Sequence, residues 1–482
     1  MSKLVENSVI YAIGGILTKA LAFFLIPLYT KYFSVEEYGM LSLLNLLLNL
    51  MTFVFLLGLS NAAERFYFDR GVDDNYRRQL YGNVTLLLFL LVITLTIAAE
   101  VFFYFFSKNL IPSVPFFPYI FLMLLLVFFN PLIQLMTGLL RVQRKAKSYI
   151  TFYLSFFIVQ AIFIIFAIGY LKTGLEGQLC ARLVTFLIFW AISIVVLLKY
   201  SRFAFSWQLT KKLFLFGIPL VPYFIFGWLI AASGRFMLER YAGLEEVGLF
   251  ALAAQFSLLI LLLSSALGHS FVPHFYETAG KPDGPEILGD LYVKIVAFFG
   301  LVVLFVLAAA RPTMLIMANP KFYGAIDYVP LLLLANWLFA IYGIFGWSLM
   351  FAKRTDVSAT ITGVMAILTI GLLFIFLKQW RMGINGVLYS MILVGIVRII
   401  VGYLVSERHY KIKHNFKGLA QTISLLLIGS SLIVLVRIDN LVISTILKLL
   451  IFCGAFIVTI KVARIESFKK LFFIGVRAGN LN

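Results

Sequence analysis

The sequence predicts an all-α protein that crosses a membrane many times. Of its 482 residues, 62 % are hydrophobic and 13 % are charged, whereas a soluble domain has about 45–50 % and about 25 %. Its apolar runs are long enough to cross a bilayer as helices, and they occur in two matching sets. This composition excludes a soluble enzyme and a nucleic-acid-binding protein, because no water-soluble fold could bury so much apolar surface.

Fourteen apolar runs have about the 20 residues that a helix needs to cross the hydrocarbon core. The predicted spans are residues 8–30, 40–63, 80–103, 115–140, 150–170, 177–198, 213–233, 247–270, 291–310, 328–351, 358–377, 384–406, 418–436 and 441–460. The longest connection on the predicted inside is residues 271–290. It contains Pro273, Pro282 and Pro285, which predicts an irregular loop.

The distribution of basic residues predicts that both termini are cytoplasmic. With the N-terminus inside, the inside segments hold 25 Lys and Arg residues and the outside loops hold ten. Positive charge favours the cytoplasmic side of a membrane protein, where it also meets anionic lipid. An even number of spans agrees with this topology, and we expect the chain to reside in the cytoplasmic membrane.

The most informative feature is an internal repeat. Residues 31–39, KYFSVEEYG, match residues 240–248, RYAGLEEVG, at an offset of 209. The same offset, without a gap, pairs Arg144 with Lys353, Lys172 with Arg381, and Gly174 with Gly383. Each copy holds six spans, so both copies have the same orientation. This predicts two six-helix lobes related by a pseudo-two-fold axis along the membrane normal.

The repeat also predicts the domains. The N-lobe is residues 1–206, the C-lobe is residues 207–415, and residues 416–482 hold two extra C-terminal helices and a cytoplasmic tail. A duplicated bundle in a polytopic protein favours a transporter that works by alternating access, although a purely structural duplication is the other reading.

The short motifs give little support to enzymatic chemistry. Glu36 and Glu37 lie in the first outside loop, where a glycosyltransferase could carry acidic residues, but Ser34-Val-Glu-Glu37 is also a capping box that begins a helix. The second copy keeps Glu246, which favours the helix start. The sequence lacks a nucleotide-binding loop, a catalytic triad and a zinc motif, and has only two Cys and four His. We expect no enzymatic activity, no cofactor and no metal site.

Lys19 is the strongest candidate for a functional residue. It lies eleven residues beyond Ser8, or about 16 Å into a hydrocarbon core of about 30 Å. A lysine at that depth costs at least about 2.5–3.5 kcal/mol, so it should face a watery cavity or a partner.

Four further residues are candidates, each with a structural alternative. Arg65 ends the second span and Arg235 ends the seventh, so both could add positive charge to a substrate cavity or lie solvated at its rim. Glu64 could serve gating or ion coupling, or could pair with its neighbour Arg65. His269 could titrate during transport, or could be a neutral histidine at a helix end.

The opening segment resembles a known family. Gly14-Gly-x-x-x-Lys19, Phe24-Leu-Ile-Pro-Leu-Tyr-Thr-Lys31-Tyr and Ser34-x-Glu-Glu-Tyr-Gly39 are followed by Arg65-Phe-Tyr67. This string is similar to the polysaccharide-biosynthesis (O-antigen-type) flippases of the multidrug/oligosaccharidyl-lipid/polysaccharide exporter superfamily.

The resemblance implies a V-shaped, two-lobed protein with a cationic central cavity, which moves undecaprenyl-diphosphate-linked oligosaccharide to the outer leaflet. Lys19 and Arg65 fall within the matched motif, whereas Arg235 is our own inference. By analogy, the two extra spans would form a groove for the polyprenyl tail. The implied partners are the lipid-linked glycan, membrane lipids and the glycan polymerases or ligases that act on it, with no nucleic acid.

Two other functions stay open from the sequence. A drug or cation antiporter of the same superfamily would be expected to have twelve spans and carboxylates in its cavity. A membrane-embedded glycosyltransferase or polymerase would need a longer outside loop with acid and base residues, which the sequence does not contain.

Overall fold

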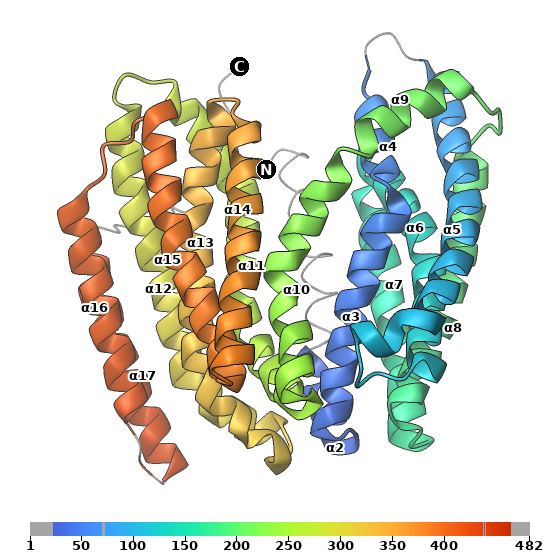
Figure 1. The fold of residues 1–482 in the computed structure, drawn as a ribbon. Helices are drawn as coiled ribbons and strands as arrows, with labels where there is room; N and C mark the ends of the chain where they lie inside the picture. Colours follow the sequence, from blue (N-terminus) through green and yellow to red (C-terminus); the bar gives the residue numbers. More distant parts are fainter. Residues whose placement is uncertain (1–22, 70–72, 437, 439, 464–482) are drawn as a thin grey trace. The chain divides into compact units, whose positions relative to one another are not determined.

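The computed structural model describes residues 23–69, 73–436, 438 and 440–463, apart from a few side chains near residue 270. These residues form helices and loops, with no strand among them (Figure 1). Thirteen of the described helical segments are long and apolar enough to cross a membrane. Most of the first predicted span lies outside the described residues. The prediction of an all-α protein with many membrane-spanning helices is confirmed.

The chain divides into two compact units, residues 3–248 and 249–482, and the boundary falls near the start of one long helix. The helices before that boundary are α2 (Ile26–Tyr32), α3 (Val35–Leu56), α4 (Leu59–Phe66), α5 (Asp74–Leu110), α6 (Phe121–Val142), α7 (Ala146–Ile164), α8 (Gly174–Tyr200), α9 (Trp207–Gly217) and α10 (Leu220–Ala242). Two short π-helices belong to the same unit, η1 (Phe116–Ile120) and η2 (Ile165–Tyr170). Within this unit α9 packs on α4, and α10 packs on α3.

The boundary helix is α11 (Leu244–Ala279). The remaining helices are α12 (Gly284–Met317), α13 (Val329–Phe351), α14 (Thr355–Leu373), α15 (Gly383–His409), α16 (Phe416–Leu435) and α17 (Leu441–Val462), with η3 (Pro320–Tyr328) and the π-helix η4 (Phe374–Gln379) between them. The expectation of an irregular loop over residues 271–290 is wrong, because only residues 280–283 separate α11 from α12. Pro285 lies in the first turn of α12, where proline is tolerated because its missing N–H would have no helical partner.

The backbone confirms the internal repeat. The helices α7 and α14 begin and end 209 residues apart, as do α8 and α15 and the π-helices η2 and η4. Two non-glycine pairs at the same offset adopt left-handed φ angles, Arg144 and Lys353 at 56° and 57°, and Lys172 and Arg381 at 54° and 50°. Since such angles are unfavourable for residues with a β-carbon, their recurrence shows that the two copies have the same backbone conformation at these positions. The pseudo-two-fold axis stays a prediction.

Each unit also contains a linker that lies against a long helix, α5 in the first unit and α12 in the second. In the first unit the Arg202 N–H donates to the carbonyl of Arg78 on α5, at 2.9 Å. A β-carbon on Gly82 would collide with the carbonyl oxygen of Arg202. In the second unit the Lys413 N–H donates to the carbonyl of Pro285 at 3.1 Å.

The second linker is packed as closely as the first. A β-carbon on Gly289 would collide with the carbonyl oxygen of Lys413. The neighbouring His414 ring is surrounded by the rings of Tyr292, Phe345, Tyr403 and Phe416, and burial there lowers the pKa of this imidazole below its ordinary value. Both linkers therefore depend on a glycine at the point of closest approach.

The predicted capping box is confirmed at the start of α3. The Ser34 hydroxyl accepts from the Glu37 N–H at 3.0 Å, and the Glu37 carboxylate accepts from the Ser34 N–H at 2.8 Å. This carboxylate is therefore engaged in beginning a helix.

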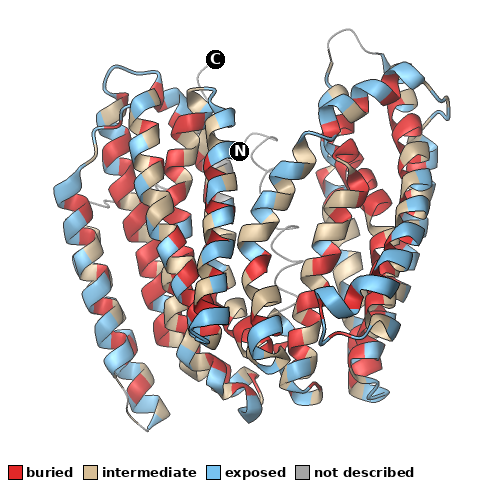
Figure 2. Ribbon diagram, viewed as in Figure 1, coloured by how far each residue is buried: buried red, intermediate tan, exposed pale blue. Residues whose placement is uncertain are grey.

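Large apolar side chains are exposed along the outer helices, as a lipid environment requires. Phe105 on α5, Val195 on α8 and Leu450 on α17 are all well exposed. Figure 2 shows exposed residues along the length of α17. In water such a surface would aggregate, so the chain is a multi-pass membrane protein.

Candidate functional site

A stripe of polar side chains runs along α6 in the first unit. Asn130, Gln134, Thr137 and Arg141 are spaced four, three and four residues apart, so they share one face of the helix. Together with aromatic side chains they border a cavity of about 210 Å³. The remaining lining residues are Ile133, Phe152, Tyr153, Phe156 and Phe186.

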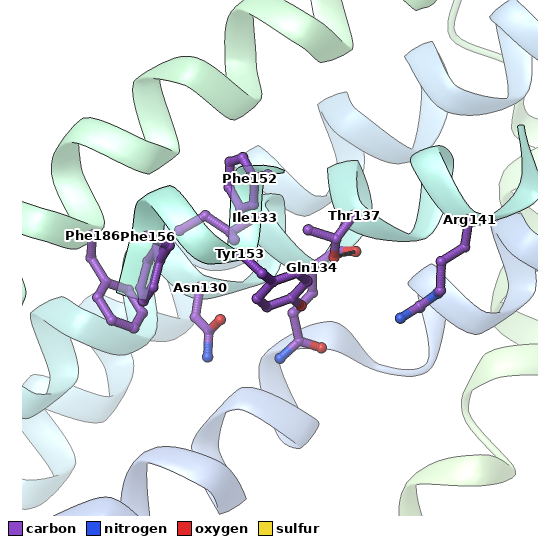
Figure 3. A pocket seen from close by; sticks show the side chains of 9 residues that line it. All are labelled: Asn130, Ile133, Gln134, Thr137, Arg141, Phe152, Tyr153, Phe156 and Phe186. Atoms are coloured by element: carbon purple, nitrogen blue, oxygen red, sulfur yellow. Dashed lines mark hydrogen bonds between the residues drawn. The ribbon is translucent and has the colours of Figure 1, made fainter. Parts of the chain in front are cut away.

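Both polar and aromatic side chains line the cavity. Figure 3 shows the amides of Asn130 and Gln134 and the guanidinium of Arg141 pointing to the same side, away from the ring of Phe152. The Asn130 amide donates to the Thr52 hydroxyl on α3 at 3.1 Å, which fixes its orientation. A pocket with aromatic walls and a few placed amides is typical of sites that bind small polar ligands.

An ion pair lies at one end of this stripe. The Arg141 guanidinium donates to the Glu64 carboxylate, which comes from α4. A β-carbon on Gly138 would press on the same carboxylate, so a glycine on α6 makes room for it. The predicted candidate Glu64 is thus held at the cavity by Arg141, and not by its neighbour Arg65.

The Glu64–Arg141 pair gives a testable expectation. Glu64→Gln should lower the unfolding temperature and the transport rate, because it leaves a half-buried guanidinium without its counter-ion. The double variant Glu64→Gln/Arg141→Gln should recover at least part of the lost stability, which thermal unfolding of the purified protein measures. A loss of stability in the double variant equal to the sum of the losses in Glu64→Gln and Arg141→Gln would contradict a pairwise interaction.

Arg182 on α8 is a charged residue within a membrane-spanning helix of the first unit. Its Nη1 donates to the Asn45 side-chain oxygen on α3 at 2.7 Å, while its Nε has no hydrogen-bond partner. Asn45 lies ten residues into α3, about 15 Å along the helix, which is close to the middle of a bilayer core of about 30 Å. One turn away, the Gln178 amide contacts the Tyr29 hydroxyl at 3.5 Å.

Arg182 has no carboxylate partner among the residues that the structure describes. Insertion of an arginine at that depth costs about 2.5–3.5 kcal/mol or more. Its bond to Asn45 keeps the guanidinium away from the nearer membrane face, which excludes simple snorkelling.

The internal repeat separates residues that the fold needs from residues that a ligand needs. A residue that only supports the backbone should recur in both copies, as Arg144 and Lys353 do. The polar residues of this site do not recur: at the 209-residue offset Asn45 becomes Ala254, Asn130 becomes Phe339, Gln134 becomes Gly343, Thr137 becomes Gly346, Arg141 becomes Met350, Gln178 becomes Val387 and Arg182 becomes Met391. The same helices therefore form without them, which favours a binding role in the first unit.

The residues predicted from sequence lie in different places. Lys19 is outside the described residues, and so is the side chain of His269, although its backbone belongs to α11. Arg65 is 59 % exposed at the end of α4 and pairs with Asp69 at 2.9 Å. Arg235 is half-buried on α10 and lies near Tyr38.

Of the predicted residues, the structure brings Glu64 to the end of the polar stripe, and neither Arg65 nor Arg235 lines the cavity. Their substrate-binding role stays a prediction. Sequence reasoning missed the stripe on α6, although its helical spacing was a usable signal. The surroundings of Arg182 could not be predicted from the sequence, because its partner Asn45 is 137 residues away.

Three comparisons with known proteins agree with this fold. A family model described as polysaccharide biosynthesis protein matches residues 4–279. The Lsg locus putative protein 1 of Haemophilus influenzae is 25 % identical over 289 residues, 57 % of this chain and 66 % of that protein, so the match spans slightly less than two thirds of the relative.

Among solved structures, the lipid II flippase MurJ in an inward closed conformation has a TM-score of 0.74 at 15 % identity, covering 97 % of this chain and 99 % of that one. An inward-facing multidrug resistance MATE family transporter of the MOP superfamily has a TM-score of 0.61 at 15 % identity, covering 81 % and 94 %. The fold is therefore one used by flippases and transporters. Because the family model matches more than half of its length, the chain belongs to the polysaccharide biosynthesis protein family.

Proposed function

We propose that this protein is a flippase that moves undecaprenyl-diphosphate-linked oligosaccharide across the cytoplasmic membrane by alternating access, with no covalent chemistry. The observation that carries the proposal is Arg182, a mid-membrane guanidinium with no described carboxylate partner. A diphosphate suits it, because guanidinium groups bind phosphate oxygens with paired, charge-assisted hydrogen bonds. Family membership and the flippase fold support the same class of cargo.

The other parts of the site have matching roles in this proposal. The amides of Asn130 and Gln134 offer donors and acceptors to sugar hydroxyls, and the aromatic side chains of the cavity offer apolar surface to sugar rings. Lys19, Arg65 and Arg235 would add positive charge along the route. Glu64 and His269 would serve gating or ion coupling, and α16 with α17 would hold the polyprenyl tail.

A drug or cation antiporter is the second candidate, favoured by the structural likeness to the MATE transporter. Its carboxylate would be Glu64, which here is neutralised by Arg141. With this carboxylate paired and Arg182 without a described carboxylate partner, an anionic cargo is favoured. Glu37, which a glycosyltransferase could have used, is engaged in the capping box.

Reconstitution in vesicles separates the three functions. A fluorescent lipid-linked oligosaccharide that changes leaflet without a change in mass supports the flippase. A change in mass would indicate a transferase or polymerase, and uptake of a cationic dye would indicate the antiporter.

Lys19 gives a second test, in cells. We expect Lys19→Ala to reduce surface polysaccharide at normal protein levels, because it removes a cation that the sequence predicts to lie about 16 Å into the membrane. Lys19→Arg should retain more export than Lys19→Gln if the charge is what matters. Unchanged export in Lys19→Ala would remove Lys19 from the site.

A further inference from the structure

In the hairpin of α16 and α17, the buried residues of α17 are polar and many of its apolar residues are exposed. The hairpin packs along α12, and both helices contact α12 extensively (Figure 1). The buried residues of α17 are Ser444, Lys448 and Thr459, while apolar residues such as Ile446 and Leu450 are exposed. The helix therefore turns its polar side toward the protein and its apolar side outward.

Lys448 is the unusual member of this buried set. It is only 8 % exposed, in the membrane-spanning part of α17. Arg311 on α12 is near enough for its positive charge to act on the Lys448 ammonium. Two cations from separate helices are thus brought together in an apolar environment.

The two residues lie at matching depths. Arg311 is six residues before the end of α12 and Lys448 is seven residues after the start of α17, so both are about 9–11 Å from the ends of their helices. That depth is within the hydrocarbon core, below the level of the headgroups but within reach of long side chains and of a locally drawn-in phosphate.

None of the ion pairs in the described part of the chain includes Arg311 or Lys448. Lone like charges in a low-dielectric environment repel each other and lose hydration, so their burial calls for a counter-anion. Snorkelling of Lys448 to the aqueous boundary would leave it far more exposed than 8 %.

We propose that Arg311 and Lys448 together bind the phosphate group of a membrane lipid. The apolar surface beside the pair suits a lipid: Phe305 on α12 is exposed and contacts the ring of Phe452 on α17 at 5.7 Å. Acyl or prenyl chains would lie along this surface while the phosphate oxygens accept from the guanidinium and the ammonium. The site belongs to the second unit and does not depend on the role of Arg182.

Two lipids present this chemistry, a phospholipid such as phosphatidylglycerol and a polyprenyl monophosphate. Each would be titrated into the full-length purified protein in detergent, and binding measured by native mass spectrometry, with diacylglycerol as the uncharged lipid. The variants are Lys448→Met, Lys448→Arg and Lys461→Met, the last being the same change at an exposed lysine of the same helix.

We expect Lys448→Met to weaken binding of at least one phosphate lipid about tenfold or more, the effect of losing one charge-assisted contact. Lys448→Arg and Lys461→Met should bind nearly as the natural sequence does. If Lys448→Met weakens binding of the polyprenyl lipid alone, the site binds a carrier lipid. If it weakens binding of both lipids, the site binds lipid phosphate in general. Either result supports the proposal.

A stability measurement keeps the test independent of binding. In detergent without anionic lipid, Lys448→Met should unfold at a higher temperature than the natural sequence, because it removes a buried like-charge repulsion. Phosphate lipid should then raise the unfolding temperature of the natural sequence more than that of Lys448→Met. The proposal would be overturned if Lys448→Met and Lys461→Met bound both phosphate lipids equally well. It would also be overturned if Lys448→Met weakened the binding of diacylglycerol as much as that of the phosphate lipids.

Discussion

Changing Arg182 to glutamine is expected to reduce the export of surface polysaccharide at least about tenfold at matched protein levels. The variant removes the guanidinium that lies at the level of Asn45, and a charge-assisted contact with phosphate is worth about 1.5–3 kcal/mol. Arg182→Lys should retain part of the activity, because it keeps the charge but loses the paired geometry. Quantified surface polysaccharide, normalised to the amount of protein in the membrane, measures both effects.

Arg398→Gln provides the matched control, since Arg398 is an intramembrane arginine of the second unit. Its guanidinium lies 4.0 Å from the ring centre of Tyr342 and 5.1 Å from that of Phe339, so it has aromatic partners within the fold. We expect its replacement to lower the unfolding temperature and to leave transport per folded molecule near normal. Equal losses of transport in both variants, or normal export by Arg182→Gln, would contradict a substrate-binding role for Arg182.

Alanine at Gly82 or Gly289 is expected to destabilise the protein by about 1–3 kcal/mol, the usual effect of overpacking a close contact. At both positions the new β-carbon would meet a backbone carbonyl oxygen, of Arg202 in one unit and of Lys413 in the other. A carbonyl cannot rotate away as a flexible side chain can, so the whole linker must shift. Thermal unfolding of the purified variants measures the loss.

Gly363→Ala is the control for this pair. Gly363 is inside α14, and a β-carbon added there would have no heavy atom within 4 Å outside the backbone of its own helix, so alanine should be neutral or stabilise the helix by up to about 1 kcal/mol. If Gly82→Ala and Gly289→Ala unfolded at the same temperature as Gly363→Ala, the linkers would not be held by close backbone packing.

The lengths of the spans and the offset of the repeat could be predicted from the sequence. The spans follow from runs of apolar residues, and the offset follows from residues that match between the two copies. The offset of 209 relates the π-helix η2 of the first copy to η4 of the second. It also relates the residues with left-handed φ angles in the two copies. The segment over residues 271–290 was misjudged because prolines were counted as breakers, whereas Pro285 occupies a first turn that tolerates proline.

The site was harder to predict than the fold for a physical reason. Hydropathy gives the depth of a residue along a helix, but not the neighbour that its side chain meets. The contact between Arg182 and Asn45 joins helices far apart in the chain, and so does the contact between Arg141 and Glu64. The absence of these residues from the second copy was nevertheless visible in the sequence, and it becomes informative once the helices are known to match.

That loss of symmetry has a consequence for the direction in which a cargo can be held. A lipid-linked sugar has one charged joint, with a long hydrocarbon at one end and a hydrophilic chain at the other. If the halves were identical and related by a two-fold axis along the membrane normal, they would accept it equally well in two lateral orientations, half a turn apart. In this protein Arg182 corresponds to Met391 in the second copy, so the two halves differ where a phosphate would bind. The cargo would then be bound with its charged joint toward the first half, in a single orientation.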